Sequence, residues 1–247
     1  MHTFFNIVFV KLIIISVQIN IILLAQEEPT PTASAKNLNS GKNSTQFSTC
    51  VDILKKDTTI KNGWFWINPG NDYEDKPFKV WCDFHRNETC VFPQLSSLVS
   101  VPVNVACSPE EIWMGTMGQK ISYPFDNSQK RVLQETSRLC HQNISIYCKN
   151  LVAFHDATQR TFDKSVKILA WNDVELTPLG PYTLRLKAVR DDCKYRDNSN
   201  EWKKTVIKYS TNRCDRLPFT DVAIRDGGRR GLGQWFYVQV APVCFSW

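Results

Sequence analysis

Nine cysteines follow an apolar leader in this chain of 247 residues, and that combination constrains the fold more than any other feature. Residues 4–25 are almost wholly apolar and precede Gln-Glu-Glu-Pro, which is typical of a secretory signal peptide cleaved after Ala25. An uncleaved membrane anchor is the alternative, because the stretch approaches the length of a membrane span. Outside the cell most of the cysteines should form disulfides, and the odd total leaves at least one thiol free or bonded to another chain.

The chain divides into three parts by composition. Residues 1–25 predict the signal peptide, and residues 26–46 have almost no apolar side chains, which predicts a polar linker containing Ser, Thr and Pro. From 47 to 247 the composition is globular and predicts one domain. Sequons at Asn43, Asn87 and Asn143 agree with export and predict a glycoprotein.

Strand patterns dominate the globular part. One helical pattern covers residues 129–139, and residues 50–55 predict a second short helix. Polar and apolar residues alternate in the segments 78–84, 143–148, 165–170, 182–188, 205–209 and 235–240. The sequence therefore predicts an α+β domain with antiparallel sheets and few short helices.

Several kinds of function are disfavoured by the sequence. The net charge of +6 is spread along the chain rather than concentrated in one basic run, which argues against nucleic acid as a partner. Cys82, His85 and Cys90 resemble half of a zinc site, but no second pair follows at the required spacing, so disulfides are favoured. His155 and Asp156 could orient a general base, yet no nucleophile motif accompanies them, so we expect no enzyme.

Aromatic and acidic residues are dense between positions 63 and 90. The run Trp64-Phe65-Trp66 could stack on sugar rings, although a place in the core is the favoured interpretation. The acidic turn over residues 68–75 offers oxygen ligands of the kind that calcium prefers, although a solvated turn is the simpler interpretation.

Seven motifs, in order, resemble the C-terminal non-collagenous domain of fibrillar collagens, also called the C-propeptide. They are W-x-W-I-N-P, F-K-V-W-C-D-F, E-T-C-V, Q-N-I-S-I-Y-C-K-N, K-T-V-I-K-Y, R-L-P-F-T-D-V-A and P-V-C-F. The resemblance covers residues 47–247. In that family the domain trimerises three chains and is not an enzyme, so the resemblance implies a secreted module that self-associates.

The resemblance also implies a set of covalent features. Its disulfides are Cys50 with Cys82, Cys90 with Cys244, and Cys148 with Cys193, and Asn143 falls on a glycosylation position of the family. Cys107, Cys140 and Cys214 have no counterpart in the family. Two of these three can pair, which leaves the third unpaired or bonded to another chain.

Three departures from the family are visible. Lys56 and Tyr73 stand where its interchain cysteines belong, which removes covalent locking of a trimer. The segment between Trp113 and Gln129 is shorter than in the family, which puts collagen-type choice of partner chains in doubt. The calcium loop lacks two carboxylates and gains an ammonium, so we expect at most weak Ca²⁺ binding. The candidate ligands that remain are Asn68, Asn71, Asp72, Tyr73 and Asp75.

The sequence has ten glycines and no Gly-X-Y tract, so it supplies no strand of a collagen triple helix. We therefore expect a secreted, structural protein of the extracellular matrix that associates with itself, with a trimer as one option, or with other matrix proteins. One alternative is a soluble recognition module that binds glycans or a receptor, and another is a modulator of procollagen assembly. The candidate residues for recognition are Trp64, Trp66, Trp81, Arg225, Arg229 and Arg230.

Overall fold

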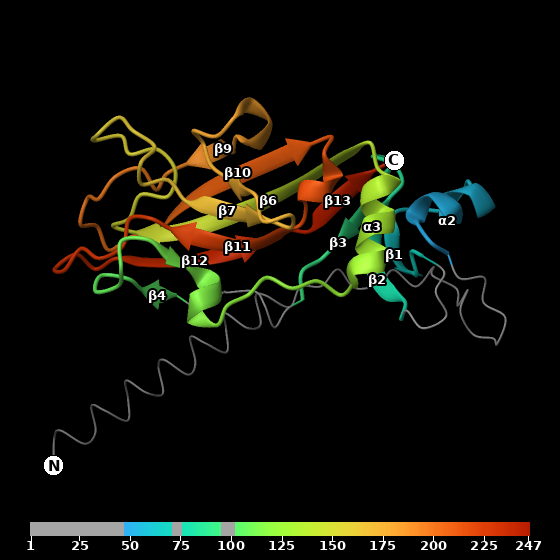
Figure 1. Cartoon of the computed structure of the whole chain (residues 1–247), viewed down its shortest axis with the longest axis horizontal. Helices are drawn as coiled ribbons and strands as arrows, with labels where there is room; N and C mark the ends of the chain where they lie inside the picture. Colours follow the sequence, from blue (N-terminus) through green and yellow to red (C-terminus); the bar gives the residue numbers. More distant parts are fainter. Residues whose placement is uncertain (1–46, 71–75, 95–101) are drawn as a thin grey trace, which may run out of the picture. The chain divides into compact units, whose positions relative to one another are not determined.

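The computed structural model describes residues 47–70, 76–94 and 102–247. The expected signal peptide (1–25) and linker (26–46) lie outside these residues, as does the sequon at Asn43. The described residues form two antiparallel sheets, two α-helices and three short 3-10 helices (Figure 1). The expectation of an α+β domain, rich in antiparallel strands and with few short helices, is confirmed.

The larger sheet has nine strands and is organised around β6 (Leu139–Lys149). Its strands follow the order β1-β2-β3-β13-β6-β10-β9, and each neighbouring pair is antiparallel. β10 pairs with one edge of β6, while β13 and β12 share the other edge, and β4 pairs with β12. The other bounds are β1 Gly63–Ile67, β2 Phe78–Asp83, β3 Glu88–Val91, β4 Val103–Asn104, β9 Lys187–Asp191, β10 Lys203–Thr211, β12 Trp235–Val240 and β13 Val243–Ser246.

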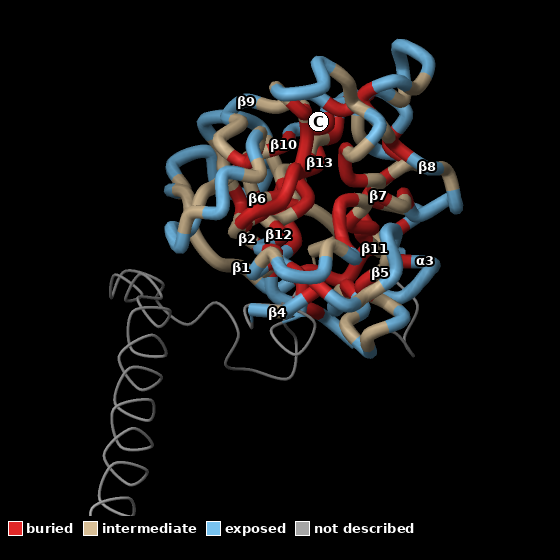
Figure 2. The backbone as a smooth tube through the Cα atoms, turned by 90° about the vertical axis from the view of Figure 1, so that its left-hand side faces the viewer, coloured by how far each residue is buried: buried red, intermediate tan, exposed pale blue. Residues whose placement is uncertain are grey.

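The smaller sheet has four strands and packs against the larger one. Its order is β5-β11-β7-β8, and the bounds are β5 Ile112–Trp113, β7 Lys167–Ala170, β8 Glu175–Leu176 and β11 Phe219–Ile224. Figure 2 shows the buried backbone of the two sheets gathered between them. Ile146 of β6, Ile168 of β7 and Phe236 of β12 are fully buried in one hydrophobic cluster. Along β6, buried and less buried residues alternate, because successive side chains of a strand point to opposite faces of the sheet.

Two short helices lie near the β1 and β2 end of the larger sheet (Figure 1). α2 (Cys50–Lys56) begins with a capping box formed by Thr49 and Asp52, and the helix expected over residues 50–55 is confirmed. α3 (Asn127–Glu135) begins with a second capping box, formed by Asp126 and Gln129. No helix in the described part of the chain is long and apolar enough to cross a membrane.

The helix expected over residues 129–139 ends earlier than its pattern predicts. The hydroxyls of Thr136 and Ser137 donate hydrogen bonds to the carbonyl oxygens of Val132 and Leu133, at 2.7 and 2.6 Å, in the last turn of α3. Leu139, which the helical pattern included, is already the first residue of β6. The helical spacing of apolar residues over 129–139 therefore runs past the end of α3 into the start of β6.

The strand expected over residues 182–188 is wrong in its first half. Tyr182–Leu184 form the 3-10 helix η3, and β9 begins only at Lys187. The carbonyl oxygen of Thr183 accepts hydrogen bonds from the Tyr209 hydroxyl at 2.8 Å and from Arg216 at 2.6 Å. These tertiary contacts hold a conformation that the local alternation does not indicate. The other two 3-10 helices are η2 (Met114–Met117) and η4 (Cys214–Arg216).

Candidate assembly site

An aromatic patch covers the outer face of the β1–β2 hairpin. The register pairs Trp64 with Trp81 and Trp66 with Lys79, which places these four side chains on one face of the sheet. Phe92, just after β3, packs against Trp64 with ring centroids 4.9 Å apart, and Trp81 meets Trp64 edge-on at 5.6 Å. We call Trp64, Trp66, Trp81 and Phe92 the aromatic face.

The aromatic face is exposed to solvent at two of its four members. Trp66 is 53% exposed and Phe92 is 40% exposed, whereas Trp64 and Trp81 are half-buried. The favoured interpretation of the Trp64–Trp66 run as core is therefore wrong for Trp66, and only Phe65 between them packs against the hydrophobic core. The alternation of a strand explains this result, because Phe65 points to the face opposite its two neighbours. An exposed patch of large aromatic side chains is typical of a contact site.

Two disulfides hold the β1–β3 region in place. Cys50 of α2 bonds to Cys82 of β2, and Cys90 of β3 bonds to Cys244 of β13, which links residues 154 positions apart. Cys148 bonds to Cys193, and these are the three pairs that the family resemblance implies. Closing loops of this size stabilises a fold by about 4 to 5 kcal/mol per bond in the chain-entropy account.

The three cysteines without a family counterpart divide into one pair and one free thiol. Cys140 of β6 bonds to Cys214 of η4, and Cys107 is free and exposed. Both partners of the pair are buried. The additional disulfide therefore fixes η4 against the central strand β6. Cys107 is the unpaired thiol that an odd number of cysteines leaves.

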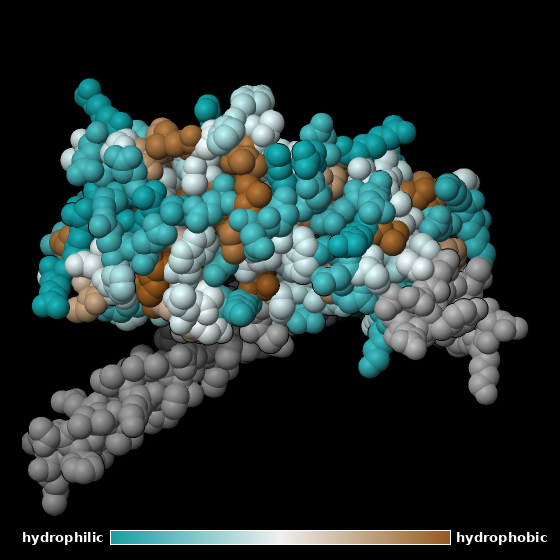
Figure 3. Space-filling view, in the orientation of Figure 1, coloured by the Kyte–Doolittle hydropathy of each residue, from teal (hydrophilic) through white to brown (hydrophobic). Residues whose placement is uncertain are grey.

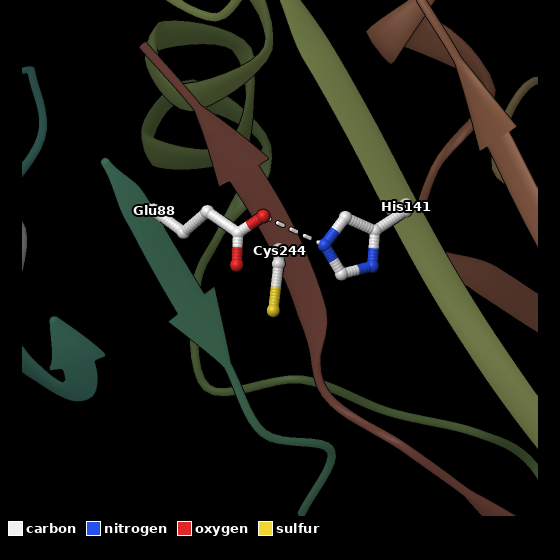
Figure 4. A group of neighbouring side chains, drawn as sticks. All are labelled: Glu88, His141 and Cys244. Atoms are coloured by element: carbon white, nitrogen blue, oxygen red, sulfur yellow. Dashed lines mark hydrogen bonds and ion pairs between the residues drawn. The ribbon is translucent and has the colours of Figure 1, made fainter. Parts of the chain in front are cut away.

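Beside the Cys90–Cys244 bond, Glu88 and His141 are hydrogen-bonded across β13, with Oε1 and Nε2 2.9 Å apart (Figure 4). The Ser246 hydroxyl donates a second hydrogen bond to Glu88, at 3.3 Å. Within the described residues, Glu88, His141 and Cys244 are the one group of three with metal-ligand spacing. Cys244 is bonded to Cys90 and offers no thiolate, so this group ties strands together instead of holding a metal.

The expected calcium loop is described only at its two ends. Asn71, Asp72, Tyr73 and Asp75 lie outside the described residues. Asn68 is buried, and its Oδ1 accepts a hydrogen bond from Gln129 Nε2 at 2.8 Å. The same Gln129 nitrogen donates to the carbonyl oxygen of Lys76 at 3.0 Å. One lone pair of the only described candidate ligand is thus used by a protein amide, which leaves a neutral and partly occupied donor for a cation.

The His155-Asp156 pair does not form the arrangement of a general base. Asp156 is fully buried, and Arg196 donates to its Oδ2 at 2.6 Å. Burial raises the pKa of Asp156, but the hydrogen bonds from Arg196 and from backbone amides outweigh it and lower that pKa below 3.8. Arg196 also forms a two-pronged pair with the buried Asp226 at 2.7 Å, so Asp156 belongs to a structural ion network.

The remaining candidate residues lie on the surface or in ion pairs. Asn87 is exposed in the turn between β2 and β3, and Asn143 lies on the outer face of β6, so glycosylation of both stays a prediction. Arg225 pairs with Glu111 at 3.0 Å and Arg229 with Asp226 at 3.3 Å, whereas Arg230 is exposed.

Taken together, two packed sheets, four disulfides and an exposed aromatic face define a disulfide-stapled α+β module. The family model of the fibrillar collagen C-terminal domain matches residues 34–245, and the chain belongs to that family.

Individual relatives agree with this assignment. The collagen alpha-2(I) chain of Oryctolagus cuniculus is 32% identical over 228 residues, which cover 88% of this chain and 41% of the relative. The alpha-2(I) chain of Rattus norvegicus is 32% identical, with 88% of this chain and 16% of the relative covered. The collagen alpha-1(II) chain of Xenopus tropicalis is 34% identical, with 80% and 14% covered. The chain thus spans less than half the length of these collagens.

Proposed function

We propose that this protein is a secreted, non-enzymatic component of the extracellular matrix that associates with itself through the aromatic face. The observation that carries the proposal is the exposure of Trp66 and Phe92 beside Trp64 and Trp81 on a hairpin fixed by disulfides. Membership of the fibrillar collagen C-terminal domain family supports a matrix module of this kind.

A second copy of the chain fits the chemistry of this face. Tryptophan and phenylalanine side chains each bury a large apolar area, and aromatic anchors dominate the energetics of protein interfaces. Lys79, the register partner of Trp66, lies at one end of these rings with its ammonium 5.1 Å from the Trp64 ring, and it supplies a charge of the kind found in a polar rim. The surface in Figure 3, by contrast, is mostly hydrophilic, with separate hydrophobic patches.

Assembly through this face would be noncovalent. Lys56 stands at one of the family's interchain cysteine positions, at the end of α2, where its ammonium lies 5.2 Å from the Phe47 ring. The other such position, Tyr73, lies outside the described residues. Noncovalent assembly makes the oligomer sensitive to concentration.

The test is light scattering after size exclusion of the secreted chain, at several concentrations, for the wild type and for Trp66→Ser combined with Phe92→Ser. Loss of a buried tryptophan anchor costs about 2 kcal/mol or more at an interface. The dissociation constant of the oligomer should therefore be roughly 30-fold higher for the double variant than for the wild type. Tyr182→Ser is the matched control, because Tyr182 is 79% exposed on η3. A wild type that is monomeric throughout, or a double variant that assembles like the control, would contradict the proposal.

A further inference from the structure

A ladder of rings and ammonium groups lies elsewhere on the larger sheet, on β6 and β12 and at the start of β10. Tyr147 and Tyr237 are register partners, and their rings stack with centroids 4.4 Å apart. Trp202 meets Tyr237 edge-on at 5.1 Å. Lys204 lies 4.9 Å from the Tyr147 ring, and Lys149 lies 5.0 Å from the Trp202 ring. We call these five residues the basic ladder.

The basic ladder has positive charge without a carboxylate partner. Among the described residues, neither Lys149 nor Lys204 forms an ion pair, whereas neighbouring Lys203 is paired with Asp197. Lys208 continues the same face of β10, four residues or about 13 Å from Lys204, and Lys187 of β9 is its register partner. These two lysines are exposed and are also outside the ion pairs of the described residues.

The aromatic rings restrict the positions of these ammonium groups. An ammonium over a ring face is held electrostatically, so part of the entropy of its long side chain is lost before any ligand binds. Several unneutralised charges spread over more than ten ångströms suit an extended polyanion better than a single small anion. Trp202 is 40% exposed and adds an apolar ring surface next to Lys149, which suits the carbon face of a sugar ring.

We propose that the basic ladder binds a sulfated polysaccharide. The ammonium groups of Lys149 and Lys204 pair with sulfate oxygens, and the partly exposed ring of Trp202 packs against a sugar ring. The choice of this polyanion rests on the extracellular location stated under Proposed function. The ladder is separate from the aromatic face, because it lies on β6, β10 and β12 instead of β1 and β2. Asn143, the predicted glycosylation site, is four residues along β6 from Tyr147, or about 13 Å.

The probe is immobilised heparin, with the full secreted chain in solution and the dissociation constant measured over a series of salt concentrations. Lys149→Ala combined with Lys204→Ala should weaken binding about tenfold, because it removes two exposed ion pairs with sulfate, each of which contributes modestly. The same variant should flatten the dependence of binding on salt. Trp202→Leu keeps both charges and should weaken binding by about threefold, through loss of the ring alone.

The matched control is Lys55→Ala combined with Lys61→Ala, which removes the same charge from exposed positions near α2 and β1. The control should bind heparin like the wild type, and chemically desulfated heparin should not bind. The proposal would be overturned if both double variants lost heparin binding equally or if the wild type did not bind heparin. It would also be overturned if duplex DNA competed as well as heparin. Light scattering on each variant separates this proposal from the proposed function, because a ladder variant that loses heparin binding should assemble normally.

Discussion

Gln129 of α3 donates a hydrogen bond to the buried Asn68, 61 residues earlier in the chain, at 2.8 Å. The same side-chain nitrogen reaches the carbonyl oxygen of Lys76, while its Oε1 accepts from the backbone N–H of Asp126. The Gln129 amide thus completes the cap of α3 and joins Asn68 and Lys76, which lie on either side of residues 71–75 in the sequence.

Replacing this amide should be costly. We expect Gln129→Ala to lower the free energy of unfolding by about 2 to 3 kcal/mol, because it breaks the capping box and leaves a buried Asn68 without this partner. Urea unfolding followed by tryptophan fluorescence measures the change. Gln159→Ala is the control, since Gln159 is exposed and uses only its backbone in its hydrogen bond to Asp156. A loss below about 0.5 kcal/mol in Gln129→Ala, on the order of an ordinary surface change, would show that the amide does not tie these segments.

The Arg196 network should govern stability in acid. Arg196→Met leaves the buried Asp156 without an ion-pair partner and leaves Asp226 with Arg229 alone, so it should cost about 3 kcal/mol or more near neutral pH. Because the folded pKa of Asp156 lies below 3.8, its contribution is present above that value and is lost as the pH falls through the folded pKa. The wild type should therefore lose stability in strong acid, and the variant should lose less, which a pH series of urea unfolding measures.

The exposed pair Arg213–Asp215 supplies the control for this series. Both side chains are largely open to solvent, so Arg213→Met should cost much less stability than Arg196→Met. An Arg196→Met variant as mild as Arg213→Met would show that the buried network does not stabilise the fold.

The Cys140–Cys214 bond should stabilise the domain measurably. Closing a loop of 74 residues contributes about 4 kcal/mol in the chain-entropy account, so Cys140→Ala combined with Cys214→Ala should lower the free energy of unfolding by a comparable amount. Peptide mapping without reduction should recover this pair and an alkylated Cys107. Cys107→Ser should leave stability unchanged. Recovery of Cys107 in a disulfide with Cys140 or Cys214 would contradict the pairing.

Calcium should have little effect on the folded protein. Adding millimolar Ca²⁺ should raise the free energy of unfolding by less than about 0.5 kcal/mol, because a neutral, partly occupied Asn68 supports only a weak site. Asn68→Asp adds a carboxylate and should increase the calcium response. Thermal unfolding in Ca²⁺ and in EGTA measures both effects, and a large shift in the wild type would show a site of ordinary strength.

Local patterns predicted much of the sheet structure. The alternation at residues 235–240 predicts β12 with its observed bounds, because one face of that strand is buried and the other is not. The helix over 129–139 and the strand over 182–188 were placed less well, since Ser137 and Thr183 take part in contacts that end the local pattern.

Long-range pairings had no local signal. Arg196 meets Asp226 across 30 residues, and Cys140 meets Cys214 across 74, so neither could be identified without the topology. The exposure of Trp66 was missed for a related reason. A tryptophan in a strand is expected in the core until the structure shows which face of the hairpin is covered.

We propose noncovalent self-association through Trp64, Trp66, Trp81 and Phe92. Sedimentation equilibrium of the secreted wild type over a wide range of concentrations tests it most directly, alongside electrophoresis without reducing agent. We expect a defined oligomer that dissociates on dilution and runs as a single chain in denaturing gels. A mass that stays monomeric at every concentration would contradict it, and so would an oligomer that only reduction can separate.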